Sequence, residues 1–359
     1  MIKSKFVTIV SLILIINNLF SQVDSSKIKT SYHKWWEDRF FKPPLNSPDA
    51  KKLALIRVLG NKFVDEKGTT VYFRGVSISD PDKIENQGHW NKHYFEELKE
   101  WGVKLVRIPV HPVSWRERTS EKYMALLDQA VAWCTDLGIY IIIDWHSIGN
   151  LKTGLFQDPM YKTSLTETFE FWRAISWHFK GNNTVAFYEL FNEPTQFFGT
   201  LGPITWEEWK KINEDLISLI RAFDKEKIPL VAGFDWAYDL TPLNISPLSA
   251  EGIGYVSHPY RSKRNPPYEP KWEIDYGFAA NKYPVIATEI GFNVRRDSAL
   301  NMEYGKAIVN YLESRGISWL AWVFDPEWYP PMFESWDTYK PTVNGEFFRQ
   351  ELLKKIETK

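Results

Sequence analysis

The stretch Val185-Ala186-Phe187-Tyr188-Glu189-Leu190-Phe191-Asn192-Glu193-Pro194 decides how the chain is interpreted. Its first seven residues are mostly apolar or aromatic, which is typical of a buried strand. Because proline lacks a backbone N–H and favours an extended residue before it, we expect the strand to end at Glu193. Barrels of alternating strands and helices carry their reactive groups at the carboxyl ends of strands. The stretch therefore predicts a carboxylate delivered to a functional site by a buried strand.

A second strand with the same kind of ending lies at Pro284-Val285-Ile286-Ala287-Thr288-Glu289. Two glutamates at strand ends suggest cleavage of a glycosidic bond, which needs a pair of carboxyl groups on either side of that bond. One group must be ionised to attack the anomeric carbon, and the other must hold a proton for the leaving oxygen. We interpret Glu289 as the nucleophile and Glu193 as the acid, which later acts as the base.

The rest of the chain alternates between strand and helix patterns. A β-hairpin is expected over residues 56–65, and a capping box is expected at Thr205 and Glu208. Eight strands separated mostly by helices predict an α/β fold with a single (β/α)8 TIM barrel; a doubly wound sheet is the alternative. The expected strands are 71–77, 104–110, 139–145, 185–193, 228–234, 252–257, 285–289 and 317–323, and the expected helices are 91–101, 120–137, 164–179, 205–222, 298–315 and 342–356.

The amino-terminal residues predict export. A basic start, an apolar run over residues 6–16 and a polar exit over residues 17–22 are typical of a cleaved signal peptide, and the run is too short to span a membrane. No cysteine follows for a lipid anchor. The expected organisation is a signal peptide over 1–22, an arm over 23–54 in which Trp35, Trp36, Phe40 and Phe41 dock on the domain, and a catalytic barrel over 55–359. We expect a secreted or periplasmic monomer.

Composition excludes several other classes of protein. The net charge of −1 gives no basis for electrostatic capture of nucleic acid or of an anionic membrane. Cys134 is the single cysteine, so no internal disulfide can form, and its apolar helical neighbours indicate a buried thiol. Seven histidines include no His-x-His pair, and the one His-x-x-x-His, His89 and His93, lies at the start of a helix. We therefore expect neither a metal site nor a cofactor.

Polar residues follow the other predicted strands, and in a barrel they would converge on one opening. Arg107 would stabilise Glu289 as an anion, with His258 and Tyr260 orienting it. Trp322 would support the sugar ring, and Asn192 would bind its 2-hydroxyl. Structural alternatives exist for these residues. Glu193 would cap a turn, Glu289 would be a structural carboxylate of the barrel, and His146 would form a hydrogen bond within the barrel. Asp80, Asp144 and Asp235 are interpreted as structural.

Taken together, these motifs resemble those of glycoside hydrolase family 5, the cellulase-like retaining enzymes of clan A. The resemblance covers most of residues 71–322. It implies Glu193 as acid/base and Glu289 as nucleophile, with Trp322 stacking at the first glycone subsite. The other residues that it implies around this subsite are Arg107, His146, Asn192, His258 and Tyr260. The motifs that carry it are Arg107-Ile108-Pro109, Asp144-Trp145-His146, Phe191-Asn192-Glu193-Pro194, Ser257-His258-Pro259-Tyr260, Thr288-Glu289 and Trp322.

The substrate is less well defined by the sequence. Aromatic residues in expected loops are candidate sugar platforms, because flat rings suit sugar faces: Trp90, Trp145, Phe197, Phe198, Trp236, Tyr238, Trp328, Tyr329 and Trp336. The segment 327–333 would close one end of the cleft and favour short or branched substrates. We expect an endo-β-1,4-glucanase acting on a β-linked polysaccharide or oligosaccharide. The alternatives are a β-mannanase, an exo-acting β-glucosidase and, in another class, a non-catalytic carbohydrate-binding barrel.

Overall fold

The computed structural model of the protein describes residues 34–38, 42–45, 53–195, 201–292 and 298–355. The chain divides into two compact units, Met1–Lys34 and Trp35–Lys359, and everything below concerns the second. The predicted signal peptide, Phe40 and Phe41 lie outside the described residues, as does most of the predicted arm. Within the described ranges, no helix has both the length and the apolar character that crossing a membrane would require.

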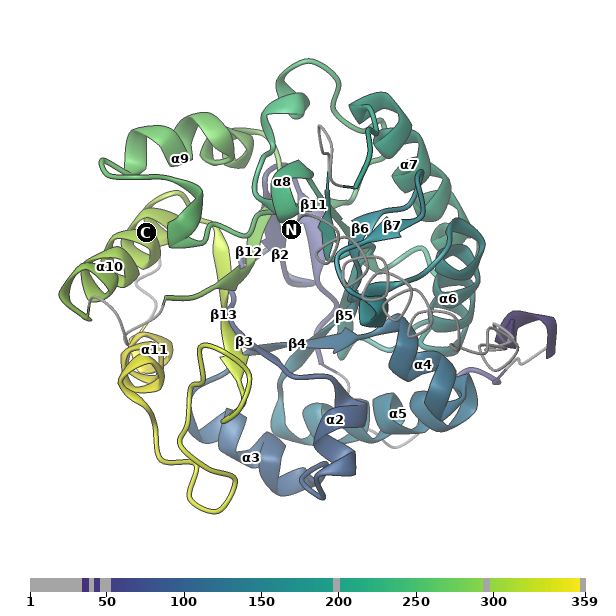
Figure 1. The fold of residues 1–359 in the computed structure, drawn as a ribbon, viewed down its shortest axis with the longest axis horizontal. Helices are drawn as coiled ribbons and strands as arrows, with labels where there is room; N and C mark the ends of the chain where they lie inside the picture. Colours follow the sequence, from purple (N-terminus) through teal and green to yellow (C-terminus); the bar gives the residue numbers. More distant parts are fainter. Residues whose placement is uncertain (1–33, 39–41, 46–52, 196–200, 293–297, 356–359) are drawn as a thin grey trace, which may run out of the picture. The chain divides into compact units, whose positions relative to one another are not determined.

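Eight parallel strands close into a barrel, which confirms the predicted TIM-barrel fold (Figure 1). Each barrel strand pairs with the next barrel strand along the chain, and the last, β13, pairs with the first, β3, to close the ring. All eight expected strands are present. They are β3 (Arg74–Ile78), β4 (Leu105–Val110), β5 (Tyr140–Trp145), β8 (Val185–Glu189), β10 (Ile228–Ala232), β11 (Gly254–Val256), β12 (Val285–Ile290) and β13 (Ser318–Phe324).

The order of the strands around this ring is their order along the chain, as repeated strand–helix units require.

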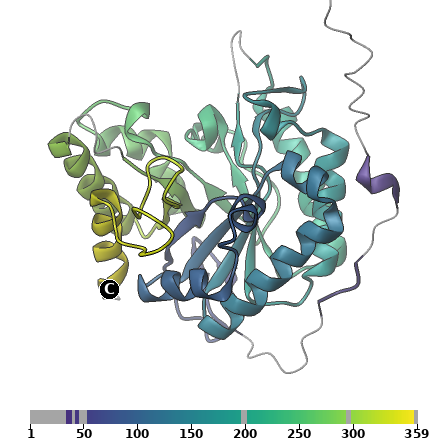
Figure 2. The same ribbon diagram turned by 60° about the horizontal axis from the view of Figure 1, so that its bottom comes forward.

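The six expected helices surround the barrel, and the second view in Figure 2 shows blue, teal, green and yellow helices around the strands. The predicted capping box begins the fourth of them, where Thr205 and Glu208 each bind the other's backbone N–H. Gly138 ends the second in a left-handed conformation, with φ of 71°. The six are α3 (Lys92–Glu100), α5 (Ser120–Leu137), α6 (Leu165–His178), α7 (Trp206–Phe223), α10 (Ser298–Ser314) and α11 (Val343–Leu353).

Shorter elements occupy the connections between strands and helices. They were not expected, because a turn or two of helix leaves little periodic pattern in a sequence. The short α-helices are α2 (Pro81–Asn86), α4 (Pro112–Arg118), α8 (Phe234–Ala237) and α9 (Glu269–Asp275). The 3₁₀ helices are η1 (Trp35–Asp38), η2 (Pro159–Tyr161), η3 (Thr241–Asn244), η4 (Arg261–Lys263) and η5 (Gly277–Asn281).

The expected hairpin is formed by β1 (Arg57–Leu59) and β2 (Lys62–Val64), which pair antiparallel. Phe63 on β2 is buried and packs edge-on against Phe187 of the barrel, with 5.1 Å between the ring centroids. It belongs to the cluster that fills the barrel, together with Leu105 and Ile142. The hairpin therefore contributes a side chain to the barrel core.

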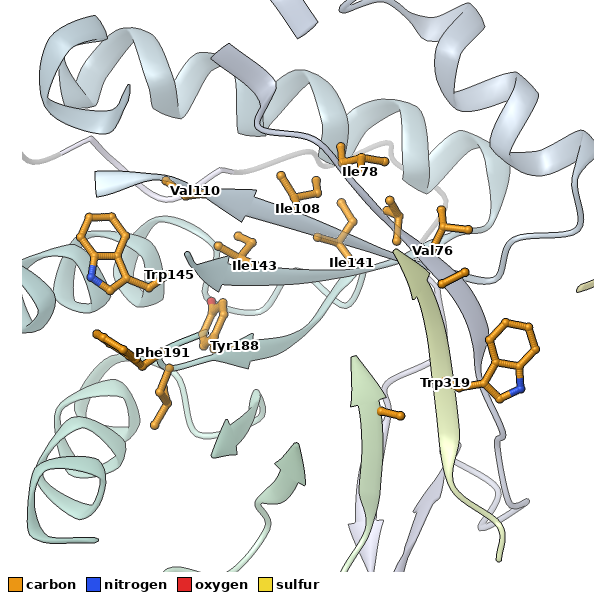
Figure 3. Packing of buried hydrophobic residues seen from close by; sticks show 14 of the residues in the cluster. Val76, Ile78, Ile108, Val110, Ile141, Ile143, Trp145, Tyr188, Phe191 and Trp319 are labelled. Carbon is orange, nitrogen blue, oxygen red and sulfur yellow. The ribbon is translucent and has the colours of Figure 1, made fainter. Parts of the chain in front are cut away.

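Residue alternation along the strands separates two cores. On β4, Val106, Ile108 and Val110 belong to the cluster between strands and helices, whereas Leu105 belongs to the cluster inside the barrel. Figure 3 shows Ile108 and Val110 with the outward-facing residues of the neighbouring strands. Because side chains alternate along a strand, Arg107 faces the interior with Leu105. This alternation delivers a charged side chain to the inside of the barrel.

The fourth barrel strand is shorter than predicted. β8 ends at Glu189, so the expected strand over 185–193 was four residues too long. Beyond it, the backbone N–H of Glu193 donates to the carbonyl of Ser147, and Glu193–Pro194 forms the short strand β9. This strand joins β6 (Ile148–Asn150) and β7 (Leu155–Phe156) in a separate three-stranded sheet. The sequence stays apolar beyond the end of β8 because Phe191 packs against Trp209 of α7.

The described part of the predicted arm contacts the barrel unit. Trp35 is buried, meets Trp115 edge-on and donates its indole N–H to Glu167, 3.1 Å away. Trp36 is partly buried against the same core. Farther along, the backbone N–H of Leu45 donates to the carbonyl of His178. Both tryptophans therefore dock as expected.

Candidate active site

The carboxyl ends of the barrel strands bring the predicted polar residues together around Arg107. This guanidinium is fully buried, and its Nε and Nη2 donate to the two carboxylate oxygens of Glu189, at 2.8 and 2.9 Å. Its Nη1 donates to Oε1 of Glu289, 2.8 Å away. Nη2 also donates to Oδ1 of Asn192 at 2.6 Å. Arg107 thus holds side chains from two barrel strands and the loop after β8 in fixed positions.

Glu289 on β12 is almost completely buried, and both of its oxygens accept hydrogen bonds. Oε1 accepts from Arg107, and Oε2 accepts from the hydroxyl of Tyr260 at 2.6 Å. Burial raises the pKa of Glu289 and Glu193 adds to this effect, while His258, Arg107 and Tyr260 favour the anion. The carboxylate is held in one orientation by two donors, and its free lone pairs remain available for attack on a bound group.

Glu193 stands on β9, opposite Glu289, with its side chain 12% exposed. Its Oε1 lies 3.0 Å from Nδ1 of His258. The ligating atoms of these three residues all lie within 4.8 Å of one another. One carboxylate oxygen of each glutamate thus lies within 4.8 Å of the other, a close approach that suits the roughly 5–5.5 Å separation of a retaining pair of carboxyl groups.

A relay of hydrogen bonds connects His258 to Arg107. Nε2 of His258 lies 2.9 Å from the hydroxyl of Thr288, which donates to Oε1 of Glu189 at 3.1 Å. Burial lowers the pKa of His258, but the carboxylates of Glu289, Glu189 and Glu193 outweigh it and raise this pKa to about 9. At neutral pH both ring nitrogens therefore carry protons, one directed at Glu193 and the other at Thr288.

The same three atoms could in principle surround a cation, because carboxylates and imidazoles are common metal ligands. However, two of these atoms are already joined by the hydrogen bond between Nδ1 of His258 and Oε1 of Glu193. Hydrogen bonding between the imidazolium and the carboxylates accounts for the cluster. We infer no metal site from it.

His146 and Asp144 form the opposite side of the centre. Nδ1 of His146 lies 2.6 Å from Oδ2 of Asp144, and the same oxygen is 3.0 Å from Nη2 of Arg107. Burial lowers the pKa of His146 and raises that of Asp144. The imidazole is therefore neutral, and its ring is parallel to the indole of Trp322, at 5.6 Å with 3° between the planes. A neutral ring and an indole can contact a sugar without introducing charge.

Two further tryptophans predicted to bind substrate are half-buried near the strand ends. Trp328 stacks on Trp322, with ring centroids 5.9 Å apart and planes 29° apart. Trp236 lies on α8, where its indole N–H donates to Gln157 at 2.8 Å and Lys263 lies 4.7 Å from its ring. The structure thus places one of these indoles after β13 and the other after β10.

The backbone that carries Trp236 is unusual. Asp235, Trp236 and Ala237 are consecutive non-glycine residues with φ of 56°, 54° and 57°. Each left-handed residue of this kind costs about 1–2 kcal/mol, so surrounding contacts must hold the turn. Lys263 donates to the carbonyl of Asp235 at 2.6 Å, and the backbone N–H of His258 donates to the carbonyl of Ala237 at 2.9 Å. The loop after β11 therefore stabilises the turn that carries Trp236.

Other aromatic residues predicted as loop platforms have different surroundings. Trp145 is the last residue of β5 and is fully buried against Phe171, so its assignment to a loop was wrong. Tyr238 is also buried, and its hydroxyl donates to Asp275. Trp90 packs beneath the surface against Phe95. The rings of these three residues therefore pack inside the protein. Trp336 is partly buried and stacks on His89, Tyr329 is 45% exposed, and Phe197 and Phe198 lie outside the described residues.

Sequence reasoning missed Glu189 and Thr288 and treated Asp144 as merely structural. Glu189 lies within the stretch that organised the interpretation, and its alternation with Phe187 indicates an inward-facing side chain. That alternation was a usable signal. Nothing in the sequence indicated that Thr288 would connect Glu189 to His258, because that contact depends on how β8, β11 and β12 are arranged around the barrel.

A parallel (β/α)8 barrel with two close carboxyl groups at its carboxyl end defines the class of barrel-type glycoside hydrolases. A family model described as Cellulase (glycosyl hydrolase family 5) matches residues 64–327. The chain belongs to this family, whose members are retaining enzymes.

Individual relatives are consistent with this family. Endoglucanase A of Butyrivibrio fibrisolvens is 28% identical over 229 residues, which is 60% of this chain and 48% of the relative. Endoglucanase E-5 of Thermobifida fusca is 23% identical over 299 residues, covering 79% and 58%. The chain thus spans about half the length of the curated relatives it matches. Among solved structures, the beta-glucanase SdGluc5_26A of Saccharophagus degradans is 46% identical with a TM-score of 0.84, covering 89% of this chain and 98% of that one.

Proposed function

We propose that the protein is an endo-β-1,4-glucanase that cleaves its substrate by double displacement. The observation that carries the proposal is the pair of carboxyl groups, Glu193 and Glu289, held within 4.8 Å at the carboxyl end of the barrel. Retaining glycosidases use a pair at about this spacing, with one group as nucleophile and the other as acid and then base.

In the first step, Glu289 attacks the anomeric carbon while Glu193 protonates the departing oxygen. A bond forms between the Glu289 carboxylate and the sugar, and the glycosidic bond breaks. In the second step, Glu193 takes a proton from water, and that water displaces Glu289 and restores both groups. Arg107 and Tyr260 hold the attacking carboxylate in orientation throughout, because each binds one of its oxygens.

Asn192 is suited to bind the 2-hydroxyl of the reacting sugar. Its Oδ1 is occupied by Arg107, while its buried Nδ2 has no hydrogen-bond partner among the described residues. A buried amide donor without a partner costs free energy, and a sugar hydroxyl would satisfy it. Trp322, beside His146, would support the same ring, with Trp328 and Trp236 supporting neighbouring sugars.

Relatives support a β-glucan as substrate. SdGluc5_26A, a beta-glucanase, has been solved in complex with cellotetraose, and the similar curated proteins are named endoglucanases. The test is product analysis after incubation with carboxymethyl-cellulose, mixed-linkage β-glucan and β-mannan. We expect rapid loss of viscosity and a mixture of oligosaccharides from the glucans. Activity confined to mannan, release of glucose alone, or binding without turnover would each contradict the proposal, in favour of the mannanase, the exo-β-glucosidase or the non-catalytic barrel.

We also propose that the protein is exported as a monomer and cleaved after about residue 22. The basic, apolar and polar segments of residues 1–22 support this proposal. Amino-terminal sequencing of the protein recovered from the culture medium or periplasm tests the cleavage. Light scattering tests the monomer.

A further inference from the structure

A pocket of about 600 Å³ adjoins the proposed nucleophile. It is lined by residues of the loops that follow β11, β12 and β13, among them Arg261, Gly291 and Tyr329. One wall is Tyr260, whose hydroxyl binds Glu289. The pocket therefore adjoins the catalytic centre, because the two share Tyr260, which contacts the proposed attacking group.

The pocket shares the loop after β13 with one of the proposed sugar platforms. The tryptophans that would support consecutive sugars are Trp236 after β10, Trp322 on β13 and Trp328 after β13. Tyr329 and Pro330 of the pocket lining directly follow Trp328 in the chain, after β13. The pocket is therefore within reach of a group attached to a sugar bound at the centre.

The charge of the pocket differs from that of the centre. Its described lining holds two arginines and no aspartate or glutamate. Arg264 is neutralised by Asp275, with Nε 2.7 Å from Oδ2. Arg261 donates from Nη1 to Oδ1 of Asn301 at 3.0 Å, and it forms no ion pair with a described carboxylate. The amide orients the guanidinium while leaving its charge uncompensated within the described part of the chain.

Aromatic rings complete the lining. Tyr260, Tyr268 and Tyr329 all contribute to the pocket, and Tyr329 is 45% exposed. Aromatic faces suit the C–H surface of a pyranose ring, and an arginine binds a carboxylate with charge-assisted hydrogen bonds. The combination fits a sugar that carries an acid group better than it fits a purely neutral one.

We propose that this pocket, the Arg261 pocket, binds a uronic acid side unit of the polysaccharide that the enzyme cleaves. The inference rests on the proposed function, because the side unit must be attached to a sugar bound between Glu193 and Glu289. Tyr260 and Tyr268 contact the ring of the side unit, and Arg261 binds its carboxylate. The pocket thereby selects among branched substrates without contributing to cleavage of a linear chain.

The test compares three substrates with the same cellohexaose backbone: unbranched, carrying one xylosyl branch, and carrying one glucuronosyl branch at the same position. Arg261→Gln should lower kcat/KM for the glucuronosyl substrate about tenfold, because a hydrogen bond to a charged group is lost. It should change kcat/KM for the other two less than about twofold. Arg57→Gln, at an exposed arginine on the β1–β2 hairpin, is the matched control and should leave all three unchanged.

A second variant tests whether the Arg261 pocket must be open, rather than whether the charge of Arg261 is needed. Asn265 is an exposed residue of the lining, and Asn265→Trp should obstruct the mouth and lower kcat/KM for both branched substrates relative to the linear one. Equal losses on all three substrates with Arg261→Gln, or unimpaired branched hydrolysis by Asn265→Trp, would overturn the inference. If the wild-type enzyme fails to cleave the linear chain, it is the proposed function that is wrong.

Discussion

Arg107 determines the arrangement of the centre at the scale of single residues. One guanidinium, with no exposure to solvent, contacts the carboxylates of Asp144, Glu189 and Glu289. Burial of so many acids is costly unless they are paired, and Arg107 and the protonated His258 supply the only positive charges that the described structure places in contact with them. The pKa values of these buried residues therefore depend on one another, and replacing one residue changes the pKa of the others.

We expect Glu289→Gln to lower kcat by more than about 10³-fold, because the amide cannot form the covalent bond to the sugar. The hydrogen bond from Tyr260 can persist to the amide oxygen, so binding of cellotetraose should remain measurable by calorimetry. Glu346→Gln, at an exposed glutamate on α11, is the control and should behave as wild type. Near-normal turnover by Glu289→Gln would rule out the nucleophile assignment.

Thr288 should act through His258. Thr288→Val removes the acceptor for Nε2–H and the donor to Glu189, so the pKa of His258 should fall from about 9. We expect the basic limb of the kcat/KM profile to move to lower pH, with Thr288→Ser restoring it. Titration of the His258 ring by NMR checks the cause. If the valine variant lost activity equally at every pH, Thr288 would have only a structural role.

At the scale of elements, the important feature is the break between β8 and β9. Glu189 remains in the barrel, whereas Glu193 is carried by a small sheet formed with β6 and β7. The proposed acid and nucleophile thus stand on separately supported elements. Their separation depends on how closely the barrel and the small sheet approach. Gly149 of β6 lies at a close contact within the small sheet, where an added Cβ would meet Phe156 at 2.5 Å and the carbonyl of Leu155 at 2.6 Å.

Gly149→Val should therefore displace β6 and, with it, Glu193. We expect kcat to fall by about 10²-fold, since a displacement of about 1 Å at a catalytic group has effects of that size. Leu155→Val is the matched control, because Leu155 lies in the same sheet with an exposed side chain. A crystal structure of the glycine variant would show the displacement, and unchanged kcat would contradict this account of the sheet.

At the scale of the whole molecule, the buried ionisable groups make stability depend on pH. The folded-state pKa of His258 is about 9, above its ordinary value of 6.5, so its contribution is complete below pH 6.5 and is lost as pH rises through about 9. Burial also raises the pKa of Asp144 and of Glu289, and a raised carboxyl pKa acts in the same direction. The protein should therefore lose stability as the solution becomes alkaline.

We expect the free energy of unfolding to fall between pH 6.5 and 9, with His258 accounting for up to about 3 kcal/mol. Urea unfolding at a series of pH values measures this change. His258→Gln should flatten the dependence, whereas His93→Gln, at an exposed histidine on α3, should not. A wild-type protein whose unfolding free energy rises over this interval would show that other groups control the dependence.

Local patterns determined the order of the strands and helices. Apolar periodicity, prolines and helix caps act over a few residues, so the eight strands, the six long helices, the hairpin and the capping box could all be predicted. The positions of Arg107 on β4 and Glu289 on β12 followed from strand order, whereas Glu193 was expected on the fourth barrel strand and lies on β9. Cys134 is buried as expected, and burial raises the pKa of its thiol.

Only the tertiary structure decided which residues from distant parts of the chain contact one another. Closure of the barrel set Glu189 and Thr288 between Arg107 and His258, moved Glu193 onto a separate sheet, and buried Trp145 and the ring of Tyr238. It also formed the Arg261 pocket from three loops that are distant in the chain. Such contacts depend on strand register and on packing between remote segments. A sequence read from one residue to its neighbours carries the short-range preferences but not these long-range distances.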